Sequence, residues 1–584
     1  MCEMSKLNVD QKNILSLFGD KNSNFIIPDY QRPYAWGEEE CQTLWEDIFE
    51  FAFPNGNYND FNKDEEYYLG PIVTFKNKEN KKEVIDGQQR LTTLMLLLRA
   101  FYVKFTASAN SEEWKKTRDL IARCLWETDE FGTANLDKLK MNSEVATDND
   151  KEEFLEILKT GTVRDNQKSK YAKNFRFFQA KIEEFSSKYM DVFSYLPIRI
   201  LNNCILLPIE ADNQNTALRI FSTLNDRGLP LSDADIFKAQ FYKYYSKKGE
   251  KDYFIKKWKS LEEICNKIFK SSAGTAMDEL FAKYMYYERA KKGIKLSTTE
   301  ALRKFYEKNS YELLRNDSTL KNLIDLANFW NDISTQDEDR FSERVLKKLF
   351  VLNYSPNAMW TYLLSVYFMK NRDADNNLDD KKLYDFLNII TVFILAYSIT
   401  NPGVNSLRTP VYAEMIKIID GEDATFGDFQ FNKDVLVKTI ENYGFLNQRP
   451  LTKSMLMWWA FQNENQELLS LSDVYEIEHI YPRNRQDHEK LLSDKKLLEV
   501  LGNKAILEKR INIRASDYRF EDKKKYYEGY TNQRKQQKRG TENKELIDLA
   551  NTKSDFVERD IVERNEKIIN SFINCLDKNR LLKV

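Results

Sequence analysis

The feature that most constrains the fold of this 584-residue chain is its shortage of glycine and proline. It has 18 Gly and 12 Pro, about 5% of the chain, where roughly 12% is usual for globular proteins. Because these residues interrupt helices and form most tight turns, their scarcity predicts long, mostly helical elements. It excludes collagen-like and Gly/Pro-rich disordered chains and disfavours turn-dense β-propellers and sandwiches. The predicted fold class is α+β, predominantly helical.

Charge and cysteine content limit the partners and the compartment. The chain carries 89 Lys and Arg against 91 Asp and Glu, which excludes a uniformly basic nucleic-acid coat but not local patches of opposite sign. The six cysteines lie far apart without a C-x-x-C pair, so they suggest neither a disulfide framework nor a zinc ribbon.

The start lacks the apolar core of a secretion signal. The longest apolar stretch, 386–399, is shorter than the roughly 20 residues of a membrane span, so we expect a buried helix there. A reduced, cytoplasmic setting without a membrane is predicted.

The first 245 residues show the patterns of a mixed α/β region. Residues 24–28 and 204–211 read as buried strands, and the β-rich runs around a charged Asn/Lys turn at 77–82 read as a hairpin. The second run stops at Asp86-Gly87, and QQRLTTLMLLLRAFYVKF follows with apolar residues at helical spacing. From about 111 to 200 the periodicity is helical and highly charged.

The rest of the chain reads as a helical body followed by a small module. From about 250 to 470 one helical pattern follows another, with no motif that indicates chemistry. The final module begins near Ser472 with the strand-like run YEIEHIYP and continues through the basic stretch QRKQQKRG. A last amphipathic helix is predicted from about 545 to 578.

The junction from Asp86 to Arg90 is the first candidate site. A helix N-terminus presents unpaired backbone N–H groups and partial positive charge, which suit an anion. Gly87 allows close backbone approach, and Gln88, Gln89 and Arg90 add donors suited to a polyphosphate. The alternative is an ordinary Asp-Gly turn followed by surface helix residues, and taken alone this alternative is favoured.

Two other N-terminal segments are also candidates. In the segment DYQRPYAW, Tyr30, Gln31 and Arg32 lie beside further aromatic residues. Such residues can bind a ligand, with the aromatic rings stacking on a base and the Arg binding a phosphate. They can instead pack the loop against the core, and both interpretations stay open. Asn225 and Arg227 lie at a predicted helix end, where a C-cap role is favoured over ligand contact.

Another candidate surrounds His479, one of only two histidines in the chain. Hydrolysis of a phosphodiester needs a base of near-neutral pKa and hard oxygen ligands for Mg²⁺. His479 can be the base, Glu478 and Asn512 the ligands, and Asn503 a hydrogen-bond partner of the loop that orients His479. The alternative is a structural histidine. The other histidine, His488, is predicted to be a solvated helix residue.

Local charge supports this C-terminal candidate. Residues 483–540 contain 17 Lys or Arg against 9 Asp or Glu, a net charge of +8 inside a chain whose total is −2. Contact with a phosphate backbone requires such an excess, although a solvated charged linker gives a similar count.

Together these motifs resemble those of the GmrSD-type, modification-dependent (type IV) restriction endonucleases, including relatives that sense phosphorothioated DNA. IIPDYQRPYAW, YYLGPIV with DGQQRLTTL, and IFSTLNDRGLPLSDADIFK are similar to a ParB/sulfiredoxin-like nucleotide-handling domain. IEHIYP with LGN and a further Asn resembles an HNH nuclease, a ββα-metal site. The resemblance implies an N-terminal nucleotide-binding and DNA-sensing domain at 1–245, a helical scaffold at 246–440 and an HNH nuclease domain at 441–584.

The resemblance also implies a role for each matching residue. The nucleotide site would contain Asp86, Gly87, Gln88, Gln89, Arg90 and Thr93, with Tyr30, Gln31 and Arg32 beside them. Glu478 and Asn512 would be metal ligands, His479 the general base and Asn503 the middle HNH residue. Where relatives have SNKPF this chain reads SDYRF, so Asp517 is an alternative to Asn512 as the last ligand.

The implied activity is that of a nucleotide-regulated, Mg²⁺- or Mn²⁺-dependent DNA endonuclease in bacterial antiviral defence, with NTPase activity in its N-terminal domain. The expected partners are DNA with a modified base or backbone and a nucleoside triphosphate. The sequence does not distinguish between GTP, UTP and ATP as this nucleotide. A homo-oligomer is compatible with the sequence. One alternative is a nucleotide-gated DNA-binding protein with an inactive HNH module, which the intact set of site residues disfavours. The other is an RNA-directed toxin nuclease.

Overall fold

The computed structural model describes residues 8–9, 11–21, 23–107, 111–145, 148–213, 216–217, 220, 232–270, 274–403 and 405–583. It divides into two compact units, Met1–Lys259 and Ser260–Val584. The described chain is mostly helical with a small mixed sheet, so the predicted fold class is confirmed at this level. The second unit holds both the predicted scaffold and the predicted nuclease module, and the boundaries at 245 and 440 stay predictions.

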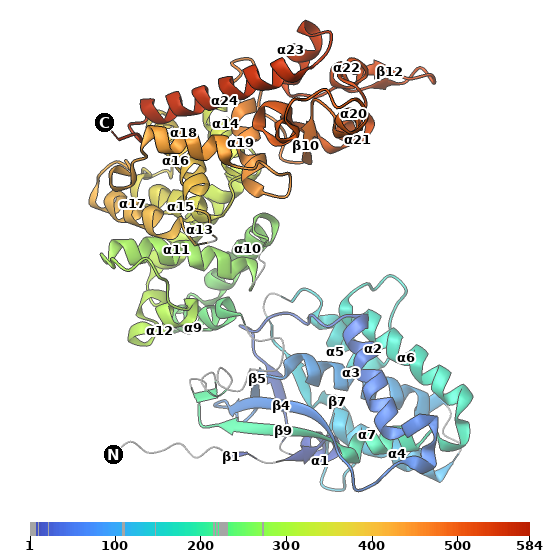
Figure 1. Ribbon diagram of the computed structural model, residues 1–584. Coiled ribbons are helices and arrows are strands. Elements are labelled where there is room, and N and C mark those ends of the chain that lie inside the picture. Colours follow the sequence, from blue (N-terminus) through green and yellow to red (C-terminus); the bar gives the residue numbers. More distant parts are fainter. Residues whose placement is uncertain are drawn as a thin grey trace. The chain divides into compact units, whose positions relative to one another are not determined.

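A mixed sheet forms the centre of the first unit (Figure 1). Its strand order is β1-β9-β4-β5-β3-β8, and β2 also pairs with β9. β4 and β5 are antiparallel, whereas β9 runs parallel to β4 and β3 runs parallel to β5. The predicted hairpin and the predicted strands at 24–28 and 204–211 are therefore confirmed. The strands are β1 (Asn8–Val9), β2 (Lys12–Asn13), β3 (Phe25–Ile27), β4 (Tyr67–Lys76), β5 (Lys82–Asp86), β8 (Met141–Ser143) and β9 (Cys204–Ala211).

The two faces of this sheet are buried in separate apolar clusters. Ile72 and Val84 enter the larger cluster, while their chain neighbours Val73 and Ile85 enter the smaller one. This alternation is the two-residue period of a strand covered on both faces. Helix α9 (Asp233–Lys247) contributes to the smaller cluster. The larger cluster is formed with α1 (Ile14–Gly19), α2 (Glu38–Ala52), α3 (Gln88–Ala107), α4 (Glu112–Leu125), α5 (Lys151–Thr160), α6 (Lys170–Lys188) and α7 (Tyr195–Asn203).

The helical periodicity predicted for about 111–200 corresponds to α4, α5, α6 and α7, but the prediction missed three strands between α4 and α5. β6 (Trp126–Thr128) and β7 (Ala134–Leu139) form an antiparallel pair, and β8 pairs with β3 in the main sheet. The four central residues of β7 are exposed, so this strand has no apolar face that would show a two-residue period. β8 is three residues long, which is too short for any periodic signal.

The start of α9 has the predicted capping box. The Ser232 hydroxyl accepts a hydrogen bond from the backbone N–H of Asp235 at 3.1 Å, and the Asp235 carboxylate accepts one from the Ser232 N–H at 3.1 Å. Asn225 and Arg227, at the end of the helix predicted just before it, lie outside the described residues.

Successive helices form most of the second unit, as predicted for 250–470. They are the second half of α10 (Lys251–Ile268), which begins in the first unit, followed by α11 (Ala276–Lys291), α12 (Leu302–Tyr311), α13 (Asp317–Ser334), α14 (Glu343–Leu352), α15 (Met359–Asn371), α16 (Asp380–Thr400), α17 (Arg408–Asp420), α18 (Lys433–Asn442) and α19 (Pro450–Ala460). Among the described residues, α16 alone is long and apolar enough to cross a membrane. It contacts α14, α18, α19 and α24 (Glu558–Lys578), and 61% of its apolar window is buried. The prediction of a buried helix at 386–399 is confirmed.

The C-terminal end of this unit combines an antiparallel strand pair with short helices. β10 (Tyr475–His479) pairs with β11 (Lys504–Glu508). The predicted last helix is divided into two, α23 (Lys544–Thr552) and α24, because Phe556 between them is buried and Asp560 caps α24 by accepting from the Val557 N–H at 2.9 Å. The other elements are α20 (Arg483–Glu489), α21 (Lys509–Ala515), α22 (Phe520–Glu528), β12 (Tyr530–Thr531) and β13 (Gln537–Lys538).

Cys41, Cys124, Cys204, Cys265 and Cys575, the cysteines within the described ranges, are all free thiols.

Candidate functional site

The strand pair β10–β11 places Glu478 and His479 on opposite faces. Glu478 lies opposite Ala505 and His479 lies opposite Lys504. Consecutive side chains on a strand point to opposite sides, and directly paired residues share a side. His479 therefore shares its surroundings with Lys504, while Glu478 faces the helices that follow β11.

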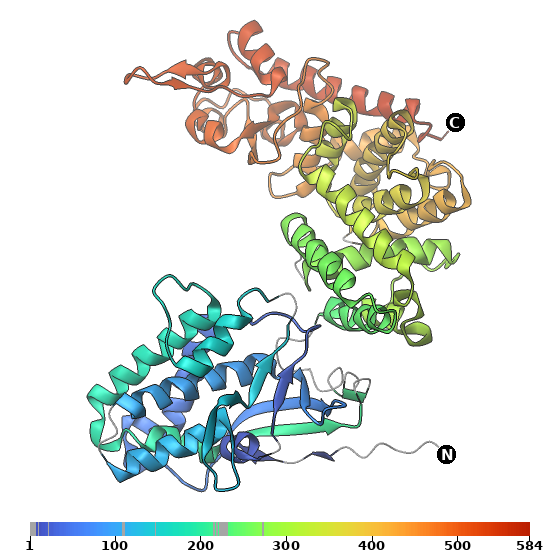
Figure 2. The same cartoon turned by 180° about the vertical axis from the view of Figure 1, so that it is seen from behind.

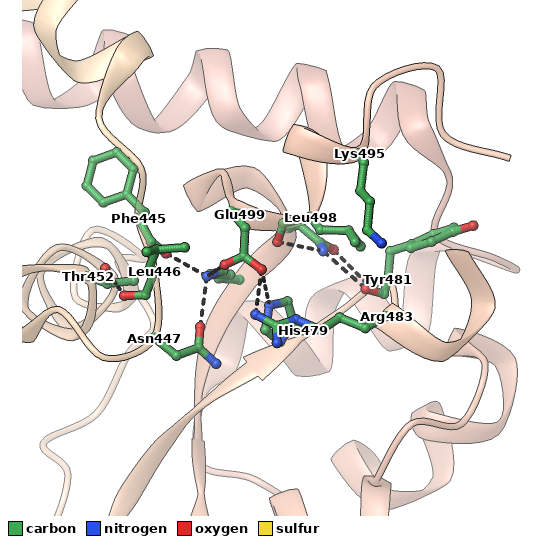
Figure 3. A network of polar contacts seen from close by, with 12 residues as sticks. Phe445, Leu446, Asn447, Thr452, His479, Tyr481, Arg483, Lys495, Leu498 and Glu499 are labelled. Atoms are coloured by element: carbon green, nitrogen blue, oxygen red, sulfur yellow. Dashed lines mark hydrogen bonds and ion pairs between the residues drawn. The ribbon is translucent and has the colours of Figure 1, made fainter. Parts of the chain in front are cut away.

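The imidazole of His479 lies beside a carboxylate that two cations neutralise (Figure 3). Glu499 accepts from Arg483 at 2.5 Å and from the buried ammonium of Lys504 at 2.5 Å. The His479 Nε2 atom is 3.8 Å from Glu499 Oε1, beyond hydrogen-bond distance. Among the described residues, this buried nitrogen has no hydrogen-bond partner. No hydrogen bond within the described residues therefore occupies this nitrogen.

Electrostatics keep this imidazole neutral. Burial, reinforced by the positive charges of Lys504 and Arg483, lowers the pKa of His479 to about 4, and the negative charge of Glu499 opposes the shift only in part. A general base must be unprotonated at the working pH, and His479 meets that condition at pH 7. Its pKa nevertheless lies well below the near-neutral value expected for the base from the sequence, so the neutral ring binds a proton weakly.

Titration of His479 tests this arrangement directly. We expect NMR of ¹³C-labelled histidine in the full chain to show a midpoint near the pKa of about 4, below the roughly 6.5 of an unperturbed histidine. The pKa of His479 is higher in the unfolded chain than in the folded chain, so the unfolded chain binds the proton more readily. The contribution of the neutral imidazole to the free energy of unfolding is therefore complete above the unfolded pKa and is lost as pH falls through the folded pKa. Arg483→Ala should move the midpoint upward, because one of the charges that lowers it is removed.

The chain's small histidine content makes the assignment simple, because His488→Gln leaves a single imidazole signal. A midpoint at the unperturbed value, or no response to Arg483→Ala, would contradict the described electrostatics.

Asn503 clamps the chain just after His479. Its Oδ1 accepts from the Tyr481 N–H at 2.7 Å, and its Nδ2 donates to the carbonyl oxygens of Tyr481 at 3.1 Å and Leu498 at 3.3 Å. The Asn503 carbonyl also accepts from the Ile480 N–H at 2.9 Å. Asn503 is fully buried, so these bonds fix the strand end that carries the imidazole. Asn503 therefore holds the loop that follows His479, and its role as the middle HNH residue stays a prediction.

Glu478 is held by two groups from one helix. Lys523 lies 2.7 Å from its Oε1, and the Tyr527 hydroxyl donates to the same oxygen at 2.6 Å. Lys523 also donates to the carbonyl oxygen of His479 at 2.7 Å. Burial raises the pKa of Glu478, and the charge of Lys523 opposes that rise. The carboxylate of Glu478 is therefore already neutralised by an internal cation.

The other predicted metal ligands lie apart from this carboxylate. The Asn512 amide donates to Glu476 at 3.2 Å, and Asp517 is exposed and approaches Glu478 only closely enough to raise its pKa. Within the described ranges, no group of three or more His, Cys, Asp or Glu side chains is arranged to hold a metal ion. In this arrangement the residues do not fit a divalent ion, so the assignments of Glu478 and Asn512, or Asp517, stay predictions.

Sequence reasoning did not single out the residues that surround His479. Glu499, Lys504, Arg483 and Lys523 belong to no short motif. The three basic residues are visible in the sequence only as part of the local excess of positive charge, and Glu499 is one of the acidic residues that reduce it. Lys504 follows Asn503 directly, so its place opposite His479 follows once the strand pair is known.

In the first unit, the predicted junction between strand and helix is confirmed. β5 ends at Asp86, α3 begins at Gln88, and Gly87 between them has φ +86°. A Cβ on Gly87 would lie 2.3 Å from the Cγ2 atom of Ile72, so glycine is required by both conformation and space.

Several residues predicted to bind a nucleotide are used by the fold itself. Gln89 accepts from the Ala35 N–H at 2.6 Å and donates to the Pro33 carbonyl at 3.2 Å. Thr93 is hydrogen-bonded to the Tyr34 hydroxyl at 2.6 Å, and both residues are buried. The segment before α2 is thereby fastened to α3.

Gln31 and Tyr30 also make contacts within the fold. The Gln31 amide donates to the Ile85 carbonyl at 3.2 Å, and the buried Tyr30 ring lies 5.7 Å from the ring of Tyr242. These contacts agree with the structural reading of the DYQRPYAW loop. Gln88, also buried, begins α3 beside them.

Asp86, Arg32 and Arg90 are brought together. Burial raises the pKa of Asp86, and the positive charges of Arg90 and Arg32 oppose the rise. Arg90 donates to the Pro71 carbonyl at 2.8 Å, whereas Arg32 has a buried Nε with no hydrogen-bond partner among the described residues. Two guanidinium groups around one carboxylate leave an excess positive charge next to the start of α3, which favours an anion.

Comparison with known families agrees with both ends of the chain. Residues 14–242 match the sequence profile described as GmrSD restriction endonuclease, N-terminal domain, and residues 428–571 match that of the GmrSD restriction endonucleases, C-terminal domain. A chain with both domains is a restriction nuclease, whose partner is DNA. The chain belongs to the GmrSD restriction endonuclease family. A search of curated proteins finds no match.

Proposed function

We propose that this protein is a nucleotide-regulated endonuclease of the type IV class that cleaves modified DNA in antiviral defence in the bacterial cytoplasm. Its C-terminal module would be of the HNH type and its N-terminal domain of the ParB/sulfiredoxin type. The observation that carries the proposal is the buried, unpartnered Nε2 of His479 in a setting that keeps the ring neutral. A neutral imidazole held at a fixed strand end is suited to take a proton from the water that attacks a phosphate.

The surroundings of His479 favour an anionic substrate. Arg483 is half exposed and lies at the same carboxylate as His479, so its guanidinium can meet a phosphate oxygen while Glu499 stays paired with Lys504. The Mg²⁺ or Mn²⁺ requirement is part of the proposal through family membership alone. No step is assigned to the ion, because Glu478 is paired with Lys523.

A basic hairpin is suited to contact the DNA backbone. Figure 2 shows the β12–β13 hairpin projecting from the C-terminal part of its unit, as Figure 1 does from the other side. Arg534, Lys535 and Arg539 on this hairpin are exposed. Exposed Lys and Arg side chains bind DNA through its phosphates without reading sequence.

In the N-terminal domain, Arg32, Arg90 and Asp86 are the residues that we propose to meet GTP, UTP or ATP. Gln89 and Thr93 would support the site by fastening the loop that carries Arg32. Binding or hydrolysis of the nucleotide would regulate cleavage by favouring one of two conformations.

Incubation of the full chain with plasmid DNA tests the proposed function. We expect cleavage of plasmid carrying modified bases or a phosphorothioate backbone in Mg²⁺ or Mn²⁺, dependence on one nucleoside triphosphate, and arrest by EDTA. Unmodified plasmid and labelled RNA of equal length are the matched controls. Equal cleavage of modified and unmodified DNA would refute modification dependence, faster cleavage of RNA would favour the toxin alternative, and cleavage in EDTA would refute the metal requirement.

A further inference from the structure

The helical part of the second unit contains a cavity that the nuclease proposal does not use. Its volume is about 810 Å³, which lies within the range of small-molecule sites. It lies wholly in Ser260–Val584. Its side chains come from the end of α10 and from α11, α13, α14 and α15, and include Phe269, Lys283, Trp330, Phe350, Trp360 and Tyr362.

Aromatic rings form much of the lining of this cavity. Trp330 and Trp360 meet edge to face with centroids 5.6 Å apart. Tyr362 stacks on Tyr286 at 4.6 Å, which fixes the orientation of its ring. Rigid, preorganised aromatic surfaces favour a planar ring as occupant, because stacking then costs little conformational entropy.

A buried lysine lies among these rings. The Lys283 ammonium is 2.9 Å from a carboxylate oxygen of Glu279 and donates to the Thr361 hydroxyl at 2.8 Å. It lies 4.9 Å from the Trp330 ring centroid and 4.7 Å from that of Tyr362. Burial lowers the pKa of Lys283, and Glu279 opposes the shift. The cavity thus pairs a fixed donor with a fixed carboxylate acceptor, as the polar edge of a heterocycle requires.

The charge of the lining favours a negatively charged occupant. The described lining residues include Lys267, Lys270 and Lys283 but only one acidic residue, Glu279. Lys267 and Lys270 are exposed, so they can meet a phosphate attached to a ring that is bound deeper in the cavity.

The cavity also touches the segment that enters the nuclease strand. Gln336 donates to the Leu469 carbonyl at 2.9 Å and accepts from the Leu471 N–H at 3.1 Å. The Phe350 ring lies 6.0 Å from the ring of Tyr475, the first residue of β10. An occupant that shifts either contact would act on the strand that ends at His479.

We propose that this cavity binds a nucleobase together with its 5′-phosphate, with the ring against Trp330, Trp360 and Tyr362 and the phosphate near Lys267 and Lys270. Lys283 and Glu279 would bind the polar edge of the base. The base comes either from a free nucleotide or from a base turned out of a DNA strand, since both present the same chemistry. We call the effect of an occupant of the cavity on β10 the relay. The relay rests on the proposed nuclease function, whereas binding of the nucleobase in the cavity does not.

Binding is measured with the full chain in EDTA, so that cleavage plays no part. The probes are 2-aminopurine deoxyribonucleoside monophosphate, whose fluorescence falls when the base stacks on an aromatic ring, and a duplex with a single 2-aminopurine, whose fluorescence is already quenched by base stacking and changes when the base leaves the duplex. We expect a saturable change in the fluorescence of at least one probe, and binding weakened about tenfold or more by Lys283→Met and by Trp360→Ala. A change with the mononucleotide alone identifies a free nucleotide as the source, and a change with the duplex alone identifies a base turned out of DNA.

Lys348→Met is the matched control, because it removes another lysine of the same unit whose pKa burial also lowers but which does not line the cavity. Arg90→Met reports on the N-terminal site. Binding lost in Arg90→Met but kept in Lys283→Met would overturn the proposal, and so would equal loss in Lys283→Met and Lys348→Met. Lys267→Glu at the exposed rim tests the charge without altering the core, and unchanged affinity there would overturn the placement of the phosphate.

The histidine signals of the same samples test the relay separately. In His488→Gln, addition of the bound probe should shift the single His479 signal, and Lys283→Met should abolish that shift. Binding without a shift would overturn the relay alone. A full chain that binds the probe in the cavity but cleaves no DNA would contradict the nuclease proposal and leave the binding proposal unchanged.

Discussion

Replacement of His479 by alanine is expected to lower DNA cleavage by about 10²- to 10⁴-fold, the range for removal of a general base. The imidazole is the described group beside Arg483 and Glu499 that can accept a proton at neutral pH, since Glu499 is paired with two cations. DNA binding should be retained, because the exposed basic side chains of the β12–β13 hairpin are unchanged. Nicking of modified plasmid and binding to a labelled duplex measure the two effects separately.

His488→Ala is the control for this substitution. It removes the only other histidine, which is exposed on α20. Its cleavage rate should equal that of the wild type, and thermal unfolding of both variants should show that each is folded. Undiminished nicking by folded His479→Ala would refute the assignment of the base.

Gly502→Ala is expected to have the largest effect on stability. A Cβ at this position would lie 2.1 Å from the carbonyl oxygen of Ile561 and 2.7 Å from the Cβ of Asn565, both on α24. Neither atom is the far end of a flexible side chain, so α24 or the turn must move, at a cost of roughly 1–3 kcal/mol or more. The neighbouring Asn503 would move with the turn and release the chain after His479. We therefore expect both a lower unfolding temperature and a loss of cleavage that persists where the variant is still folded.

Gly444→Ala provides the matched glycine substitution. A Cβ there would meet no heavy atom within 4 Å, and its backbone is not in the left-handed region. Its unfolding temperature and cleavage rate should remain those of the wild type. A Gly502→Ala protein that unfolds at the wild-type temperature would show that α24 does not pack against this turn as described.

The sequence predicted those parts of the fold whose signals are local. The β4–β5 hairpin, the capping box at Ser232 and the junction at Gly87 each depend on residues within a few positions of one another. The sequence did not predict β6 to β8, because β7 is mostly exposed and β6 and β8 are only three residues long each, so none of them shows a two-residue pattern of apolar side chains. The division of the last helix depends on Phe556, whose burial is visible only once the chain is folded.

The candidate sites were predictable in position but not in detail. His479 and Asn503 could be singled out because their motifs are short, and the structure places them in one network. The pairing of Glu478 with Lys523 joins residues far apart in the chain, and no spacing rule predicts it. Gln89 was a candidate phosphate ligand because of its residue type. In the structure its side chain accepts a hydrogen bond from the Ala35 N–H and so holds the loop before α2.

Lys504 limits how this enzyme can be divided for study. Its buried ammonium donates to the Phe445 carbonyl and to Asn447 at 2.8 Å as well as to Glu499. A fragment that begins near Ser472, where the strand-like run starts, would remove the first two acceptors and expose a buried charge next to the imidazole. A fragment made for crystallisation or screening therefore has to include Phe445 and Asn447, and Ser260–Val584 is the compact unit that contains them.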